Sequence, residues 1–347
     1  MESPSSLVLR HLPLGRGPWQ TFEPFLFCVH HSDRYPAGNQ QMAPQESLAG
    51  RNIGSDFSGL NGWSMYHGNQ VPGFPQHPHR GFETISIIRQ GLIDHSDSLG
   101  ATARIGAGDV QWMTAGSGIV HAEMFPLVHQ DQHNPTDFFQ LWLNLPAVNK
   151  MTPPQFKMFW NEEIPHATYT DQAGKKSTVR VIAGSFKELK PLAPPSHSWA
   201  SKHNTDVAIW LINLESNAEL TLPQQPKGCK RVIYHVSGSR IYLGDTSLHP
   251  EHGALMRAHY EHPIRGGLQP TSLLVLQARP IGEPVVQHGP FVINSSHEIR
   301  QTINDYQRTR FGGWPWAKPD PAHPRTKGRF ARFADGKEVK PPSAHRQ

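Results

Sequence analysis

The sequence predicts an all-β protein with two successive barrel or jelly-roll domains, one short C-terminal helix and an extended basic tail. Short β-branched, apolar segments recur from about residue 84 to residue 278, and Gly- or Pro-containing turns separate them. The 30 Gly and 32 Pro are scattered between these segments, as in a turn-rich β fold. Only the segment after Ser295 has clear helical periodicity.

The first series of expected strands ends at Leu145. Its clearest member is Phe138–Leu145, where Phe139, Leu141 and Leu143 face one side and the intervening residues are mostly polar. A segment that alternates in this way is typical of a strand with one buried face. The other expected strands of this series are Thr84–Gln90, Ala101–Ile105 and Val110–Thr114.

A domain boundary is expected near Lys150–Pro154, where the strand pattern breaks and a polar, Pro-containing stretch begins. A second series of strands follows. We therefore divide the chain into residues 1–155, 156–294 and 295–347. The expected strands of the second series are Val179–Ala183, Val207–Leu214, Arg231–Val236, Ser239–Leu243 and Ser272–Ala278.

The one expected helix begins at Ser295 and runs to about Arg310. Ser295 and Glu298 have the spacing of a capping box, in which each side chain satisfies a free backbone N–H of the first turn. Ile299, Ile303 and Tyr306 fall on one face. Beyond Gly312 the chain reads as an extended tail, whose Trp314 and Trp316 are candidates to anchor it.

Charge and composition exclude several classes of protein. The net charge is +5, but residues 300–347 hold eleven Lys/Arg and four Asp/Glu, so the rest is about −2 and no direct nucleic-acid binding is expected. Two cysteines, Cys28 and Cys229, cannot form a disulfide framework. No apolar run reaches the ~18 residues of a membrane span. We expect a cytoplasmic protein without membrane contact, or a nuclear one in a eukaryote.

Two pairs of polar residues predict a metal site. His77 and His79 stand two apart on an expected strand and so share one face. His121 and Glu123 repeat this arrangement on a second strand. One such pair is weak evidence, but two pairs about forty residues apart indicate that all four side chains bind one ion. Three imidazoles and a carboxylate suit Fe(II), while Mn, Ni, Cu and Zn stay open.

The residues around these pairs resemble the pirin family of the cupin superfamily. The resemblance is carried by His77-Pro-His79-Arg-Gly-Phe-Glu83-Thr84, by the Gly108–Met124 segment and by Glu283–Val292, and it spans roughly residues 22–310. It implies two tandem cupin domains, with His77, His79, His121 and Glu123 as ligands. Thr84 stands where many cupins place a ligand glutamate, and Glu83 is expected to be a second-shell or outward residue.

The resemblance also implies two alternative functions. One is a dioxygenase of the quercetin 2,3-dioxygenase type, which takes O₂ and a small aromatic substrate and uses Glu123 as both ligand and base. Its apolar pocket would be lined by Phe74, Trp112, Phe125 and Trp142. The other is an iron-dependent, redox-sensing regulator that binds a transcription factor or a metabolic enzyme without turnover.

Two regions depart from the compact family pattern. The second series of strands contains the pairs His249/Glu251 and His259/Glu261 but no pair of histidines two apart, so we expect it to hold no metal. The loop 39–62 is longer than in compact pirins and is a candidate to cover the metal pocket. This loop and the tail 311–347 lie largely outside the matched segments.

Overall fold

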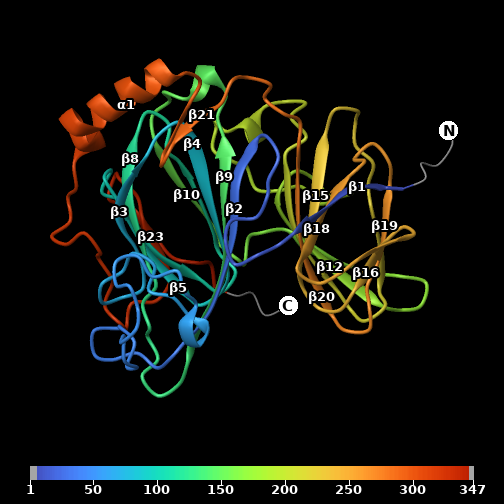
Figure 1. Cartoon of the computed structure of the whole chain (residues 1–347), viewed down its shortest axis with the longest axis horizontal. Helices are drawn as coiled ribbons and strands as arrows, with labels where there is room; N and C mark the ends of the chain where they lie inside the picture. Colours follow the sequence, from blue (N-terminus) through green and yellow to red (C-terminus); the bar gives the residue numbers. More distant parts are fainter. Residues whose placement is uncertain (1–5, 344–347) are drawn as a thin grey trace. The chain divides into compact units, whose positions relative to one another are not determined.

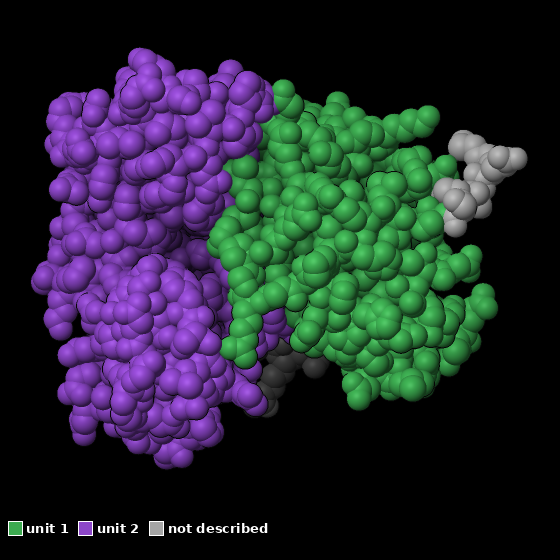
Figure 2. Space-filling model, viewed as in Figure 1, with its two compact units in different colours: residues 1–28, 163–282 green, residues 29–162, 283–347 purple. Residues whose placement is uncertain are grey.

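The computed structural model describes residues 6–343 and confirms an all-β architecture with one α-helix (Figure 1). The chain forms two compact units (Figure 2). Unit 1 comprises residues 1–28 and 163–282, and unit 2 comprises residues 29–162 and 283–347. Each unit is built on two larger β-sheets, as expected for tandem cupin domains, and unit 2 also holds a two-stranded sheet.

Unit 2 holds a five-stranded and a six-stranded sheet. The order of the first is β10-β7-β4-β9-β2, and that of the second is β24-β23-β6-β5-β8-β3. Their strands are β2 (Phe25–Tyr35), β3 (Gly73–His79), β4 (Phe82–Gln90), β5 (Leu92–Asp97), β6 (Thr102–Gly106), β7 (Val110–Thr114), β8 (Ile119–Met124), β9 (Asn134–Asn144), β10 (Gln155–Phe159), β23 (Phe330–Arg332) and β24 (Glu338–Val339).

The two sheets of unit 2 face each other across a shared interior. Ile88 of β4, Ile93 of β5 and Phe138 of β9 pack in one buried cluster. Polar side chains also bridge the sheets, because Ser86 of β4 donates a hydrogen bond of 2.8 Å to Glu123 of β8. The interior is therefore apolar in one part and polar in another, and the polar part contains the candidate site.

Unit 1 holds a seven-stranded sheet of order β1-β18-β15-β20-β13-β12-β11 and a four-stranded sheet of order β14-β19-β16-β17. Trp210 and Ile233 lie in its apolar core and are fully buried. Its strands are β1 (Val8–Pro13), β11 (His166–Thr170), β12 (Lys176–Ala183), β13 (Ala208–Leu214), β14 (Glu219–Leu222), β15 (Lys230–Ser237), β16 (Ile241–Leu243), β17 (Thr246–Leu248), β18 (His252–Met256), β19 (His262–Arg265) and β20 (Thr271–Ala278).

The units do not follow the linear division expected from the sequence. Strand pairing assigns β1 to unit 1, because it runs antiparallel to β18 from Val8 opposite Met256 to Pro13 opposite His252. The hairpin of β21 (Val286–His288) and β22 (Phe291–Ile293) belongs to unit 2 with everything after it. Unit 2 thus takes its strands from two separate parts of the chain.

The helix α1 spans Ser296–Thr309, and its start confirms the Ser295 half of the expected capping box, while the Glu298 carboxylate accepts from the Ser295 hydroxyl at 2.6 Å. Ser295 is its N-cap, and the Ser295 hydroxyl accepts a hydrogen bond from the backbone N–H of Glu298. Ile299 packs with Phe291 and Phe311 in a small buried cluster of unit 2.

No helix within residues 6–343 is long and apolar enough to cross a membrane. Four short 3₁₀ turns cover Leu60–Gly62, Ala147–Asn149, Trp199–Ser201 and Arg310–Gly312.

Residues 311–343 of the basic tail are a structured part of unit 2. Its strand β23 pairs with β6, which places Phe330 opposite Arg104. The indole N–H of Trp316 donates to the carbonyl oxygen of Asp97 at 2.9 Å, so the expected aromatic anchor is present. The backbone N–H of Gln76, beside His77 on β3, donates to the carbonyl oxygen of Pro319 at 2.7 Å. The tail therefore contacts strands that carry the candidate site.

One buried ion pair joins the tail to the six-stranded sheet. Asp94 and Arg104 are cross-strand neighbours on β5 and β6, and both side chains are fully buried. The Arg104 guanidinium donates to both carboxylate oxygens of Asp94 at 2.7 Å. It also donates to the carbonyl oxygens of His323, Pro324 and Lys327 at 2.9, 2.9 and 2.7 Å. A single side chain thus satisfies three backbone acceptors of the tail.

Candidate metal centre

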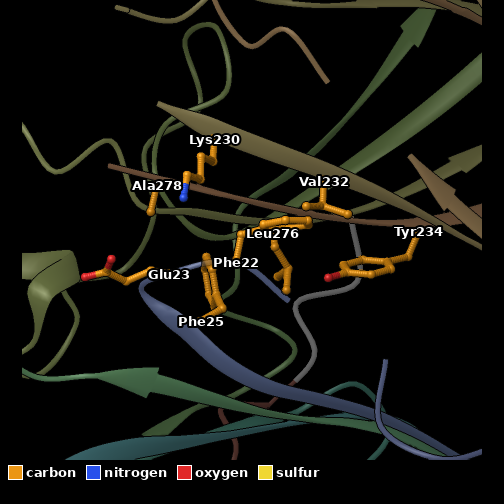
Figure 3. A pocket seen from close by; sticks show the side chains of 8 residues that line it. All are labelled: Phe22, Glu23, Phe25, Lys230, Val232, Tyr234, Leu276 and Ala278. Carbon is orange, nitrogen blue, oxygen red and sulfur yellow. The ribbon is translucent and has the colours of Figure 1, made fainter. Parts of the chain in front are cut away.

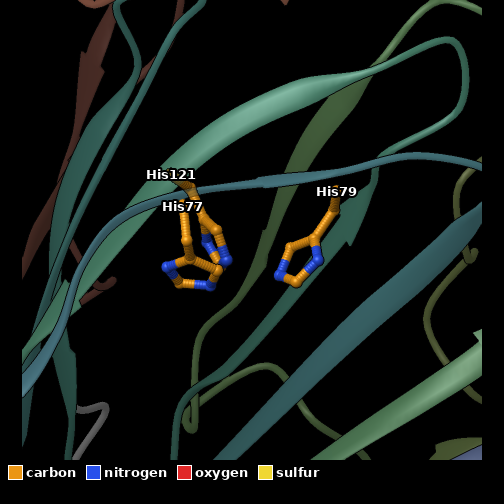
Figure 4. A group of neighbouring side chains, drawn as sticks. All are labelled: His77, His79 and His121. Carbon is orange, nitrogen blue, oxygen red and sulfur yellow. The ribbon is translucent and has the colours of Figure 1, made fainter. Parts of the chain in front are cut away.

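Three histidines converge in the interior of unit 2 (Figure 4). Antiparallel pairing of β3 and β8 places His77 directly opposite His121, and their ring centres are 4.4 Å apart. His79 follows two residues later on β3, with its ring centre 4.9 Å from that of His121. Each histidine offers a nitrogen, and the three nitrogens all lie within 4.8 Å of one another. The expected histidine set is therefore brought together.

The hydrogen bonding of these imidazoles fits a metal ion. His79 Nδ1 and both ring nitrogens of His121 are buried without a hydrogen-bond partner. Leaving a buried polar atom unpaired costs about 1–3 kcal/mol, and a bound cation removes that cost. His77 Nδ1 lies 2.8 Å from the carbonyl oxygen of Pro75 and must donate to it. The Nε2 atom of His77 then carries the lone pair that a metal requires.

Burial keeps the three imidazoles neutral. Desolvation lowers the pKa of His77 to about 4, although a hydrogen bond to the backbone of Pro75 opposes the change. The same cause lowers the pKa of His79 and His121 well below the usual value, and the neighbouring histidines add to it. Metal ligation requires the neutral form. The site is thus prepared for a cation at neutral pH.

Glu123 is buried beside the histidines but is held by other partners. One carboxylate oxygen accepts a hydrogen bond from Ser86 at 2.8 Å, and the other accepts from the Gln140 side-chain amide at 2.7 Å. It is not among the groups whose ligand atoms lie within 4.8 Å of one another. Desolvation raises its pKa, which His95 and the Ser86 hydrogen bond partly oppose. Its role as a fourth ligand stays a prediction.

A second polar group in the same interior was not predicted. His95 of β5 lies opposite Glu123 on β8. Its Nε2 is 3.1 Å from an Asp97 carboxylate oxygen, and its Nδ1 is 2.9 Å from the Gln111 side-chain amide. His95 and Asp97 are themselves two residues apart on a strand. The spacing that identified the other pairs was therefore available as a signal.

The four expected pocket residues occupy different places. Phe74 lies 6.3 Å from His77 between ring centres, and Trp142 lies 5.4 Å from His79. Phe125 packs behind Phe74, at 6.1 Å. The structure does not bring Trp112 to the histidines. Strand alternation places Trp112 on the face of β7 opposite to that of Gln111, which bonds to His95, and Trp112 contacts Phe159 there.

Glu83 is fully buried on the face of β4 that points away from the histidines. It alternates with Thr84 along β4, on the opposite face from Ser86, and its carboxylate accepts a hydrogen bond of 2.8 Å from Thr114.

The two His/Glu pairs of unit 1, His249/Glu251 and His259/Glu261, lie in loops that flank β18. Within residues 6–343, His77, His79 and His121 form the one group of three or more such residues close enough to share an ion.

Comparison with known proteins identifies the family. The model of the family named Pirin matches residues 12–143, and the model of the Pirin C-terminal cupin domain matches residues 209–312. The chain belongs to the pirin family. It is 35% identical over 254 residues to the human protein named Pirin. The aligned residues cover 71% of this chain and 80% of the human one.

Two further relatives carry enzyme names. A Pseudomonas aeruginosa protein called "Putative quercetin 2,3-dioxygenase" is 36% identical over 242 residues, covering 70% of this chain and 80% of the relative. A crystal structure described as quercetin 2,3-dioxygenase from Acinetobacter baumannii superposes with a TM-score of 0.69 at 27% identity. That match covers 88% of this pirin and 98% of the crystallised chain.

A separate pocket lies in unit 1 (Figure 3). None of its lining residues is a candidate metal ligand. Tyr234, on its wall, is fully buried and donates a hydrogen bond to the carbonyl oxygen of Gln20 at 2.8 Å. The lining residues are Phe22, Glu23, Phe25, Lys230, Val232, Tyr234, Leu276 and Ala278. Since the histidines belong to unit 2, this pocket is not part of the metal centre.

Proposed function

We propose that this pirin is a metal-dependent dioxygenase of the quercetin 2,3-dioxygenase type that acts on flavonol-like substrates. The observation that carries the proposal is the three-histidine cluster with unpaired, buried nitrogens beside a buried carboxylate. The names of two relatives support the same reaction class. His77 is partly exposed whereas His79 and His121 are buried, so we expect a substrate to approach from the side of His77.

The residues that would hold the ion are His77, His79 and His121, with Glu123 as the proposed fourth ligand. Three nitrogens and one carboxylate favour Fe(II), and Ni, Cu, Mn and Zn are the alternatives. A bound divalent ion would supply Lewis-acid polarisation of the substrate oxygens and a binding position for O₂. Structural metal sites usually fill their coordination with protein ligands, whereas four protein ligands around a six-coordinate ion leave two positions open.

Glu123 is the residue that we propose as the base. Its pKa is raised by burial, so the carboxylate takes up a proton more readily than a carboxylate in water does. Ser86 and Gln140 each donate one hydrogen bond and fix the plane of the carboxylate. Each oxygen still has a second lone pair, which can accept the proton of a flavonol 3-hydroxyl. Phe74 and Trp142 provide apolar surface next to the cluster.

The test is an aerobic assay of protein loaded with iron, nickel or copper, in which loss of the quercetin absorbance is followed. Glu123→Gln should lower turnover at least 100-fold, because positioned base catalysis typically contributes about 10²–10⁴. Metal content, measured by elemental analysis, should be retained in part through the histidines. Full activity in Glu123→Gln would remove Glu123 from this role.

The alternative function predicts a different outcome of the same assay. A redox-sensing regulator would bind the metal tightly and show no turnover with any of the three metals. For both functions we propose a location in the cytoplasm, or in the nucleus of a eukaryote. The reason is that Cys28 and Cys229 form no disulfide, as is usual in a reducing compartment.

A further inference from the structure

The candidate metal centre is least buried beside Phe74. Of the three histidines only His77 is partly exposed, and Phe74, three residues earlier on β3, is partly exposed as well. Their ring centres are 6.3 Å apart. A ligand that approaches the centre from solvent therefore meets the Phe74 ring next to His77.

Two rings from the preceding loop extend this aromatic surface. The ring of His67 lies 5.6 Å from that of Phe74, edge to face. The ring of Phe57 lies 5.2 Å from His67 and 6.5 Å from Phe74. Both side chains face solvent, and Phe57 is 54% exposed. Together Phe57, His67 and Phe74 form an aromatic strip that ends at His77.

The loop that carries Phe57 is firmly anchored, although residues 39–62 contain no β-strand. Arg51 and Asp56 form a buried ion pair at 2.8 Å, and the Arg51 guanidinium lies 3.3 Å from the centre of the Trp63 ring. Asp56 also accepts a hydrogen bond from the backbone of Met65 at 2.9 Å. Phe57 is the next residue after Asp56. An exposed ring that is held in place without being buried loses little freedom when it binds a ligand.

His67 adds a defined hydrogen-bond acceptor to the strip. Its Nδ1 lies 2.8 Å from the carbonyl oxygen of Gly54, so this nitrogen must carry the proton. The Nε2 atom of the neutral ring then has a free lone pair. The backbone N–H of His67 donates to the carbonyl oxygen of Gly73, at the start of β3. The position of the ring is thus fixed relative to the strand that carries His77.

We infer that Phe57 and His67 determine the specificity of the metal centre for planar aromatic ligands that carry hydroxyl groups. Phe57 contacts the part of the ligand farthest from the metal, and the Nε2 atom of His67 accepts a hydrogen bond from a ring hydroxyl. This inference rests on the proposed function for the substrate class, but it concerns binding and not turnover.

The experiment measures ligand binding to the cobalt(II)-loaded full chain under argon, where absence of O₂ prevents turnover. Phe57→Ala should weaken quercetin binding about 3- to 10-fold, which is the usual contribution of one aromatic contact, and Phe57→Tyr should restore it. His67→Phe keeps the ring and removes the acceptor. It should weaken quercetin more than 3-hydroxyflavone, which has only the metal-binding hydroxyl.

Two controls separate the strip from general effects on the loop or the metal. Ile53→Ala changes another exposed apolar residue of the same loop and should leave quercetin binding unchanged. Azide is a small metal ligand and should bind all variants equally. Quercetin affinity of Phe57→Ala within twofold of the parent, or no quercetin binding by the parent, would overturn the inference. If quercetin binding depends on Phe57 but the iron-, nickel- and copper-loaded proteins show no aerobic turnover, only the proposed dioxygenase function would be overturned.

Discussion

Replacement of Arg104 by Met tests whether the tail is a structural part of unit 2. Arg104 is fully buried, and its guanidinium satisfies both Asp94 oxygens and three tail carbonyls. Removing one partner of a buried ion pair costs about 3–5 kcal/mol, because the remaining charge stays buried and unpaired. The three tail carbonyl oxygens lose their donor as well, but they can accept hydrogen bonds from water when the tail detaches. We therefore expect a loss of about 4 kcal/mol in the free energy of unfolding of unit 2.

The measurement is thermal and urea unfolding followed by tryptophan fluorescence. For a unit of this size, 4 kcal/mol corresponds to a fall in Tm of about 8–16 °C. The double variant Asp94→Leu/Arg104→Met removes both charges and should recover at least half of the loss. Arg308→Met breaks an exposed pair, in which the arginine is 76% exposed, and should change stability by less than about 0.5 kcal/mol. A loss below about 1 kcal/mol for Arg104→Met, or a double variant no more stable than the single one, would refute this reasoning.

Two other predictions concern histidines of unit 2. His121→Ala should abolish stoichiometric metal binding, and a chelator should lower the Tm of the parent by about 5–10 °C but leave the variant unaffected, since a ligand at 100 times its Kd stabilises by about 2.7 kcal/mol. Burial lowers the pKa of His31 to about 3, with a smaller effect from His30. Between pH 6.5 and 3 the unfolded state therefore binds a proton at His31 that the folded state does not bind. The free energy of unfolding should fall as the pH drops through this range, by up to about 1.4 kcal/mol per pH unit from this histidine. His31→Phe, which keeps the stacking on Phe138, should flatten this slope in urea titrations at several pH values.

Local signals in the sequence were sufficient for much of the fold and for the histidine set. The alternation of Phe138–Leu145 located β9, and the Ser295 capping box located α1 to within one residue. Both patterns report on neighbours in the chain. The i, i+2 spacing of His77 and His79 likewise needs only the geometry of one strand, and pairing with β8 then completes the cluster.

Features that depend on pairing between distant segments were not predictable in this way. Strand β1 is short, with little alternation, and only its hydrogen bonds to β18 assign it to unit 1. Strand β23 lies in a basic tail and becomes a strand because β6 offers it a free edge. The environment of Glu123 depends on Ser86 and Gln140 from the opposite sheet. None of these partners is close in sequence.

The assignment of the tail to unit 2 has a consequence for how the protein is made. After residue 162 a ribosome must synthesise residues 163–332, about 170 residues, before β23 is complete. At about 5–20 residues per second this interval lasts about 9–34 s. During that time the histidines already exist, but β6 has an unpaired edge of the kind that promotes aggregation, and Arg104 lacks its backbone acceptors. We therefore expect the nascent protein to need protection of this edge until β23 has been synthesised.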